Sequence, residues 1–351
     1  PKNPVIGYRS FGPDVEKVSK LALASYRGMK KAGIEGSFKH FPGHGDTHVD
    51  SHLGLPVLQK SKNELQMEEL APFQYGIDHG VEMIMVGHLA VPSLTGGKEI
   101  PASISPEIIK GLLKNEMGFK GLVVSDALNM QAVAKLFPEL GELEWKAFEA
   151  GNDLLCFSDH VVEGIQKICE MATEETIDLA FEKVQKLKRE LGVFGFEKLE
   201  VPEFDWDNLS EFQQKLASNY VSLIQGEVDK AEIRKLGASG NLAVHSYFPS
   251  EKNVFEEKMQ SLIKGNHKIE KNIIALFVPS HKPLNQFGLT KEVINQVQDL
   301  AKETSTILVH FGNPLALAHL GDLSAFEAVI CGYQNFPEAQ EATFLKLVGS
   351  G

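Results

Sequence analysis

The sequence predicts an α/β protein in two parts, and two observations carry this prediction. In the first part, apolar runs of strand length alternate four times with helical patterns, which favours parallel strands joined by crossover helices. Polar residues follow successive runs, as in a TIM-type β/α barrel, where catalytic groups lie at the carboxyl ends of the strands. We assign residues 1–195 to this part, 196–210 to a linker and 211–351 to a second α/β part.

The elements of the first part are predicted from their end signals and their periodicity. Asp14 can start a helix that Gly33 ends, and Ser61 with Glu64 forms a capping-box pattern for the next helix. The apolar residues that fall mostly on one side of the first helix are Val18, Leu21, Ala22, Ala24 and Met29. A strand starts at 36–38, further strands lie at 81–88, 121–126 and 151–157, and helices lie at 105–117 and, as one long helix, at 165–191.

The second part is predicted from short, continuous apolar runs bounded by turn residues, which are typical of buried parallel strands. A helix around 212–224 comes first, and a helical tail follows Phe336. The strand runs are 242–244, 273–278, 307–311 and 328–330. The segment before them is interpreted as a linker because it is acidic, contains Pro202 and shows little periodicity.

Composition excludes several classes of function. The net charge of −12 argues against a nucleic-acid partner, which would need a basic surface. No apolar run approaches the length of a membrane span. Cys156, Cys169 and Cys331 are too few and too scattered for a disulfide framework or a zinc ribbon, so we expect small buried apolar residues.

The stretch 39–52 is the most unusual in the chain, because it holds four histidines and two aspartates in fourteen residues. Pro42, Gly43 and Gly45 break regular structure, so a strand is expected to run into a polar, titratable loop. A solvated surface turn, a metal site and an acid/base loop are the three interpretations. The metal site is the less favoured, because no helical ligand spacing such as His-x-x-Glu-His is present.

Two motifs resemble one enzyme family. The run from Lys39 to Thr47, followed by Asp50-Ser51-His52, resembles the signature of the β-N-acetylglucosaminidases of glycoside hydrolase family 3. Val-Val-Ser-Asp-Ala-Leu-Asn-Met, which ends at Met130, resembles the nucleophile motif of that family. The resemblance implies a retaining exo-β-N-acetylglucosaminidase with no cofactor and no metal. Its carbohydrate substrate would be a GlcNAc-containing glycan or muropeptide from bacterial cell-wall peptidoglycan.

The resemblance also implies an incomplete barrel. Family members carry their first barrel strands before the segment that matches residues 1–12, and only four to six strands are expected here, whereas a closed barrel usually needs eight. We therefore expect the C-terminal part of a β/α barrel followed by an α/β sandwich, and poor solubility or activity for these residues alone. The partner chain, the aglycone and the compartment, whether bacterial cytoplasm, periplasm or cell surface, stay open, as does the choice between hydrolysis and phosphorolysis.

The catalytic roles follow from the chemistry and the resemblance together. Cleavage of a glycosidic bond needs one group to protonate the leaving oxygen and another to stabilise charge at the anomeric carbon. Asp126 ends an apolar strand and is expected to be the nucleophile, although a strand-end Asp can also be a helix N-cap. The resemblance implies that His52 is the acid/base and Asp50 its orienting partner, because a carboxylate can fix the tautomer of an imidazole. The alternative is that Asp50 caps a turn and His52 is solvated.

Four further residues are expected to bind substrate. Lys39, His40 and Arg9 match family residues that hydrogen-bond the sugar hydroxyls, with a surface ion pair as the alternative. His88 ends a strand that faces the same rim, so it is expected to line the pocket, with a satisfied core histidine as the alternative.

Three other functions are weighed against this one. A family 3 β-glucosidase or xylosidase usually has a different sequence after Lys-His-Phe, without Pro-Gly-His-Gly. A non-catalytic carbohydrate-binding relative is disfavoured by the presence of Asp126, Asp50 and His52. A metal-dependent hydrolase would lose its activity with a chelator.

Overall fold

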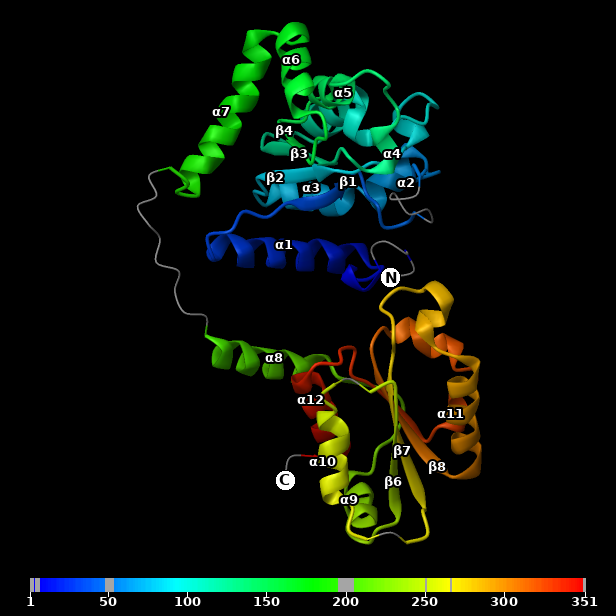
Figure 1. Ribbon diagram of the computed structural model, residues 1–351. Coiled ribbons are helices and arrows are strands. Elements are labelled where there is room, and N and C mark those ends of the chain that lie inside the picture. The colour runs from blue at the N-terminus through cyan, green and yellow to red at the C-terminus, as the bar shows by residue number, and fades with distance from the viewer. Residues whose placement is uncertain are drawn as a thin grey trace. The chain divides into compact units, whose positions relative to one another are not determined.

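The computed structural model describes residues 3, 7–47, 54–194, 205–249, 251–265 and 267–349 (Figure 1). Contacts between residues divide the chain into two compact units, Asn3–Glu200 and Val201–Gly351, and each unit is described by itself. Helix α8 begins at Trp206, so its first residues fall inside the predicted linker 196–210. The boundaries at 195 and 211 stay predictions.

The first unit alternates strands and helices along the chain, where η marks helices that are not α-helical. Its elements are η1 (Gly7–Arg9), α1 (Val15–Lys31), β1 (Phe38–Phe41), α2 (Lys62–Met67), α3 (Ala71–Asp78), β2 (Met83–Val86), η2 (Pro92–Leu94), η3 (Ala102–Ile104), η4 (Glu107–Glu116), β3 (Leu122–Ala127), α4 (Gln131–Ala134), α5 (Glu142–Ala150), β4 (Leu154–Cys156), α6 (Val161–Met171) and α7 (Glu174–Glu190). This order confirms the predicted alternation of strands and helices.

The strands of the first unit form one parallel sheet in chain order, β1-β2-β3-β4. Parallel neighbours joined through helices are the repeating unit of a TIM-type β/α domain, as predicted, so the carboxyl ends of the strands lie along one edge. Large, fully buried side chains from strands and helices form the core beneath them, among them Phe41, Leu65, Ile84, Ile109 and Leu113.

The helix starts predicted in this unit are confirmed. The Asp14 carboxylate accepts a hydrogen bond from the Lys17 N–H at the start of α1. Ser61 and Glu64 form both bonds of a capping box at the start of α2. Each bond satisfies a backbone N–H that the first turn of a helix leaves without an intrahelical partner.

The buried side of α1 differs from the predicted one. Ser19, Leu23 and Tyr26 are buried, whereas the predicted Leu21 and Met29 are exposed. The reason is an aromatic anchor that helical periodicity does not reveal. The Tyr26 ring packs edge-to-face on Phe38, and its hydroxyl donates a hydrogen bond to the Glu35 carboxylate over 2.7 Å.

Two other boundaries are corrected by the structure. The single helix predicted at 165–191 is two helices, α6 and α7, because Thr173 is extended and caps α7 by accepting from the Thr176 N–H. Strand β1 continues to Phe41, so Lys39 and His40 lie in a strand and not in the loop that follows.

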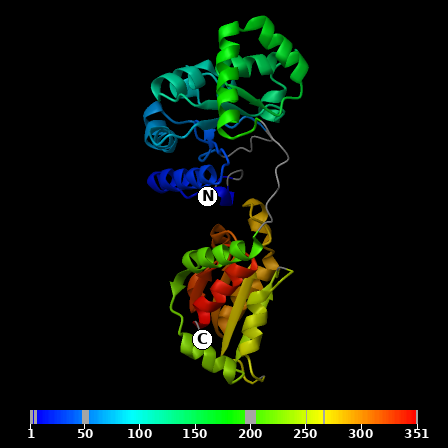
Figure 2. The ribbon, with the colours of Figure 1, turned by 90° about the vertical axis from the view of Figure 1, so that its left-hand side faces the viewer.

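The second unit is an α/β sandwich around a mixed sheet. Its elements are α8 (Trp206–Tyr220), β5 (Ser222–Gly226), α9 (Lys230–Ala238), β6 (Leu242–Tyr247), α10 (Val254–Leu262), β7 (Lys271–Phe277), η5 (Leu284–Gly288), α11 (Lys291–Glu303), β8 (Ser305–Phe311), η6 (Pro314–His319), η7 (Leu323–Ala325), β9 (Ala328–Cys331) and α12 (Pro337–Val348). The strand order is β5-β9-β8-β7-β6. Separate buried clusters on the two faces join α8, α9, α10 and α12 to one face and α11 to the other (Figures 1 and 2).

All four strands predicted in the second unit are present and parallel, but one helix prediction is wrong at its end. Residues 222–224 belong to β5, which pairs antiparallel with β9 at the edge of the sheet, and not to the helix predicted at 212–224. A backbone ladder to a strand about a hundred residues away outweighs the helical pattern of the local sequence, which is a tertiary effect.

The described residues contain three free cysteines, and only Cys331 is fully buried as predicted. Cys169 is exposed and Cys156 is partly exposed, so for these two the prediction of buried apolar residues is wrong. Within the described ranges, no helix combines the length and the apolar character that crossing a bilayer requires. The same ranges hold no group of three or more His, Cys, Asp and Glu side chains arranged for a metal ion.

Candidate active site

Asp126 lies at the carboxyl end of β3, one residue before the strand ends. The strand forms because Leu122, Val123 and Val124 are buried, and the Asp126 side chain keeps 18% of its surface exposed at the edge of the sheet. Its Oδ1 accepts a hydrogen bond from the Ala127 N–H over 2.8 Å. The next helix begins later, with Met130 as its N-cap, so Asp126 is not a helix cap.

His40, on β1, faces this carboxylate across the sheet edge. Its Nε2 lies 3.8 Å from Asp126 Oδ2, close enough for electrostatic attraction but too long for a hydrogen bond. Burial lowers the pKa of His40 from 6.5 to about 4, and the charge of Asp126 opposes this shift. The imidazole is therefore neutral at pH 7. Its Nδ1 is buried and has no hydrogen-bond partner among the described residues.

Two cationic side chains lie near the imidazole. The positive charges of Lys39 and Arg9 both lower the pKa of His40, which places them in its neighbourhood. Lys39 is exposed on β1, and Arg9 is exposed at the end of η1. Three predicted substrate-binding residues therefore gather around the predicted nucleophile, although they come from sequence positions more than eighty residues away from it.

Cys156 is a member of the same edge that the sequence reasoning missed. It is the last residue of β4 and is the register partner of Ala127. Burial raises the pKa of its thiol, the Asp126 carboxylate acts in the same direction and the Lys39 ammonium acts against it. The signal was its position, because it lies one residue before the end of a predicted strand, close to where Asp126 lies in the preceding one.

The base of the histidine-rich loop is fixed by a buried network. Asn3 donates from Nδ2 to the carbonyl oxygens of His44 and Thr47, over 2.7 and 3.0 Å. Thr47 Oγ1 lies 2.6 Å from His44 Nδ1, and the His44 ring packs edge-to-face against that of His40. His44 thus shapes the base of the loop next to the candidate site.

A lysine holds the same loop from the side of α2 and α3. Lys60 Nζ lies 2.9 Å from Asp46 and also forms ion pairs with Glu68 and Glu69. Burial opposes the charge, but hydrogen bonds to these three carboxylates raise the pKa of Lys60 above its ordinary value. Gly43 packs so closely on Glu69 that an added Cβ would lie 2.5 Å from the Glu69 Cβ, at a φ of +131°.

The predicted acid/base pair, Asp50 and His52, lies outside the described residues, as does His48. The described part of the loop ends at Thr47 and resumes at Gly54. Both roles therefore stay predictions.

His88, which is predicted to bind substrate, has both of its ring nitrogens against protein groups. The side chain is fully buried, and both ring nitrogens have protein partners. Nδ1 lies 2.7 Å from Ser103 Oγ, and Nε2 lies 2.8 Å from the carbonyl oxygen of Ala127. The satisfied core histidine, which was the alternative interpretation, is what the structure contains.

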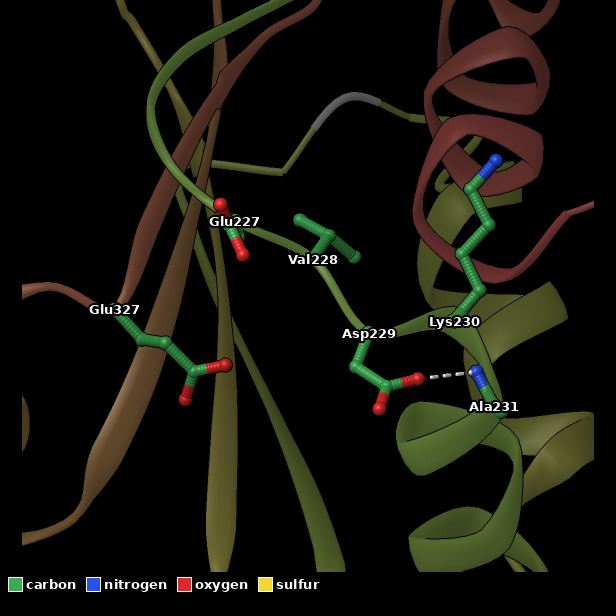
Figure 3. Close-up of a pocket in the computed structure, with 6 residues that line it drawn as sticks. All are labelled: Glu227, Val228, Asp229, Lys230, Ala231 and Glu327. Carbon is green, nitrogen blue, oxygen red and sulfur yellow. Dashed lines mark hydrogen bonds between the residues drawn. The ribbon is translucent and has the colours of Figure 1, made fainter.

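The second unit contains a hollow of a different kind (Figure 3). It is lined by Glu227, Val228, Asp229, Lys230, Ala231 and Glu327. Two of its three carboxylates have protein partners, since Asp229 accepts from the Ala231 N–H at the start of α9 and Glu327 forms a 2.7 Å ion pair with Lys271. None of the predicted site residues lies there.

The fold and the strand-edge groups define a TIM-type β/α protein with a carboxylate, an imidazole and two cationic side chains at the carboxyl ends of its strands. Comparison with known families agrees with this class. The model of the glycosyl hydrolase family 3 N-terminal domain matches residues 1–187, more than half of the chain. The chain belongs to glycoside hydrolase family 3.

Two β-hexosaminidases that are similar in sequence match only part of the chain. It is 38% identical over 164 residues to a β-hexosaminidase A of Pseudoalteromonas piscicida, and 38% identical over 169 residues to a β-hexosaminidase of Neisseria meningitidis serogroup C. These matches cover 44% and 47% of the chain, but only 27% and 45% of the relatives. The chain thus matches less than half the length of either relative.

Solved structures match almost the whole length of the chain. A family 3 β-N-acetylglucosaminidase from Paenibacillus sp. str. FPU-7 aligns with a TM-score of 0.79 at 25% identity. The alignment includes 99% of this chain and 71% of that structure. The β-glucoside phosphorylase BglX aligns with a TM-score of 0.81 at 21% identity, over 99% of the chain and 70% of that structure. The second likeness shows the fold alone.

Proposed function

We propose that the chain forms part of a retaining exo-β-N-acetylglucosaminidase, with its catalytic groups in residues 1–195. The observation that carries the proposal is the approach of His40 Nε2 to 3.8 Å from Asp126 Oδ2 at the carboxyl ends of β1 and β3. A carboxylate with an imidazole and cationic side chains around it suits a ligand that is rich in hydroxyl groups and reacts at a carbon that develops positive charge.

Asp126 is proposed as the nucleophile. Its Oδ1 is held by the Ala127 N–H, so the other oxygen, Oδ2, is the one that faces the space next to His40. Attack of this oxygen on the anomeric carbon breaks the bond to the leaving oxygen and forms a covalent glycosyl ester. Lys39, Arg9 and the neutral His40 are proposed to hydrogen-bond the sugar hydroxyls.

His52 is proposed as the acid/base and Asp50 as its orienting partner. In the first step the imidazolium gives its proton to the leaving oxygen, and in the second step the imidazole takes a proton from the water that attacks the glycosyl ester. Support comes from the Asp-x-His sequence and from the anchored base of the loop, where Asn3 and Lys60 hold the residues just before it.

The substrate is proposed to be a GlcNAc-containing glycan or a muropeptide from peptidoglycan turnover. The support is the motif in residues 39–52 together with the β-hexosaminidase names of the relatives that match at 38% identity. A second activity, β-glucosidase or β-xylosidase, is separated from this one by the substituent at C2 of the sugar.

A direct test compares two substrates of the complete protein of which the chain is proposed to form part, because residues 1–351 alone are expected to have poor activity. We expect the kcat/KM for 4-nitrophenyl N-acetyl-β-glucosaminide to exceed that for 4-nitrophenyl β-glucoside by about 100-fold or more, since a site that hydrogen-bonds an acetamido group discriminates strongly against its absence. Asp126→Asn serves as the blank for both. Equal or reversed preference would overturn the proposed specificity. A complete protein that cleaves neither substrate would overturn the proposed glycosidase activity.

A further inference from the structure

We propose that His88 is a positioning residue that fixes the strand end carrying Asp126. The inference rests on the proposed function, because it assigns to His88 a part in the presentation of the nucleophile. His88 follows β2, and its ring reaches across to the carbonyl oxygen of Ala127, the residue directly after Asp126. The 2.8 Å bond ties the ends of two neighbouring strands through a side chain.

The bond to Ala127 is needed because the backbone ladders stop or slip at this point. The regular pairing of β2 with β3 ends at Val86 and Ser125. The pairing of β3 with β4 shifts register between Val124 and Ala127, so Asp126 lies in an irregular segment. Side chains therefore supplement the backbone bonds here, of which the Leu128 N–H to the Cys156 carbonyl oxygen, over 2.9 Å, is the next on the side of β4. Irregular strand ends of this kind re-aim a side chain.

Two side chains form these supplementary hydrogen bonds. Ser125 Oγ accepts the Cys156 N–H over 3.0 Å on the side of β4, and His88 donates to the Ala127 carbonyl on the side of β2. The Ala127 N–H in turn donates to Asp126 Oδ1. Both backbone polar groups of Ala127 are thus fixed: the N–H holds the carboxylate, and the carbonyl oxygen accepts from His88 and from the Met130 N–H, over 3.1 Å.

The protonation of the ring follows from its partners. A carbonyl oxygen can only accept, so Nε2 carries the hydrogen that is donated to Ala127. Burial lowers the pKa of His88 below its ordinary value, so the ring is neutral at pH 7 and Nδ1 accepts from the Ser103 hydroxyl over 2.7 Å. Ser103 is itself held, because Asn152 Nδ2 donates to its carbonyl oxygen over 2.8 Å.

The side chains in this chain of bonds are buried. His88 and Ser103 are fully buried and Asn152 is 1% exposed, whereas Ala127, at the strand end that carries Asp126, is partly exposed. Gly87, next to His88, is packed against His40, where an added Cβ would lie 2.9 Å from the His40 Cβ. The segment after β2 therefore packs against the His40 side chain at Gly87 and bonds to the end of β3 at His88.

Two substitutions distinguish the effects of the two hydrogen bonds that the His88 ring makes. The amide of His88→Gln reaches as far as Nε2 and can donate to Ala127, whereas the shorter His88→Asn reaches only the position of Nδ1 and Ser103. Loss of the Ala127 bond should act on the step in which the carboxylate attacks, because its placement matters in the transition state more than in substrate binding. His79→Asn, on the exposed end of α3, is the matched control.

The experiment measures covalent labelling of the intact protein by 5-fluoro-N-acetylglucosaminyl fluoride, followed by intact mass, together with kcat and KM for the aryl N-acetylglucosaminide. We expect His88→Asn to lower kcat and the labelling rate by about 10- to 100-fold, with KM changed by less than about threefold. His88→Gln should stay within about threefold of the parent, and His79→Asn should match it. Ser103→Ala should give a smaller loss than His88→Asn and replaces it if that variant does not fold.

Parent-like labelling and kcat in folded His88→Asn, or in Ser103→Ala where that variant replaces it, would overturn the inference and leave His88 a core residue only. An equal loss in His88→Asn and His88→Gln would overturn it too, because the Ala127 bond would then not be the cause. Absence of label on Asp126 in the active parent protein would instead overturn the proposed nucleophile, and the role of His88 with it.

Discussion

His40 and His310 have almost the same local setting and opposite surroundings. Each is the penultimate residue of a parallel strand, β1 or β8, and burial lowers the pKa of each from 6.5 to about 4. Each has a buried Nδ1 with no hydrogen-bond partner among the described residues. They differ in what Nε2 faces, which is the Asp126 carboxylate for His40 and the backbone carbonyl of Asn313, at 3.0 Å, for His310.

The difference teaches that a perturbed histidine at a strand end does not by itself mark a site. His310 is fully buried and its Nε2 faces a backbone carbonyl group, so the lowered pKa of its imidazole is the ordinary consequence of burial. His40 retains 12% of its side-chain surface and has a carboxylate and two cations near it. A charged partner combined with access from solvent is what distinguishes a candidate active-site group.

Removal of the Asp126 carboxylate should have the largest effect. Asp126→Asn keeps the size of the side chain but cannot form the glycosyl ester, so kcat should fall by about 10⁴-fold or more for every leaving group. Steady-state rates on aryl N-acetylglucosaminides measure this. Asp299→Asn, an exposed change on α11, should leave the rates as they are. Residual activity above a few per cent in Asp126→Asn would contradict the assignment.

Removal of the proposed acid should depend on the leaving group. His52→Ala should lower cleavage of a natural disaccharide by about 10²- to 10⁴-fold, because its leaving oxygen needs a proton. A nitrophenol needs little protonation, so formation of the ester should suffer less and KM should fall together with kcat. Azide, which needs no base, should restore turnover and give the β-glycosyl azide. Equal loss for good and poor leaving groups, without rescue, would make His52 a binding residue.

The two strand-end histidines can be compared by one identical substitution. His40→Asn should lower kcat/KM by about 10- to 10³-fold, because it removes a group next to Oδ2 of the nucleophile. His310→Asn should leave kcat/KM within about twofold of the parent, since the residue belongs to the other unit and its Nε2 faces a backbone carbonyl oxygen. Similar losses of activity in both variants, with both proteins folded, would break the comparison.

The smallest effect is expected in the pH dependence of stability. Because the folded-state pKa of His310 is about 4 against 6.5, the unfolded chain binds a proton that the folded chain does not between these values. Stability is therefore fully present above about pH 6.5 and is lost as the pH falls toward about 4, by at most about 3 kcal/mol from this residue. Urea unfolding of the intact protein at pH 7 and pH 4.5 measures the loss, which should be smaller in His310→Asn. An unchanged loss would contradict the assigned shift.

The sequence predicted the alternation of strands and helices and the residues that gather at the strand ends, because both follow from local patterns. Apolar runs mark β1 to β4 and β6 to β9, and parallel pairing then brings Lys39, His40 and Asp126 to one edge. Strand β5 was missed because its only support is the antiparallel ladder to β9. The residues of a local helical pattern cannot reveal such a distant partner.

The role of His88 and the anchor at Asn3 were beyond local patterns for the same reason. The Asn3 amide bonds to residues 41 to 44 positions away, and the His88 ring bonds to a carbonyl 39 positions away. A histidine that ends a strand looks the same in sequence whether its ring points to a pocket or to a neighbouring strand. Only the positions of Ala127 and Ser103 decide between the two for His88.

The most direct test of the central claim is to identify the residue that becomes covalently glycosylated. The intact protein is treated with 5-fluoro-N-acetylglucosaminyl fluoride, in which fluorine at C5 slows hydrolysis of the ester while the acetamido group at C2 is kept, and its peptides are then analysed by mass spectrometry. We predict one added fluorinated sugar, on the peptide that contains Asp126 and on that side chain. A label on another carboxylate, or full turnover of the substrate by Asp126→Asn, would contradict the account.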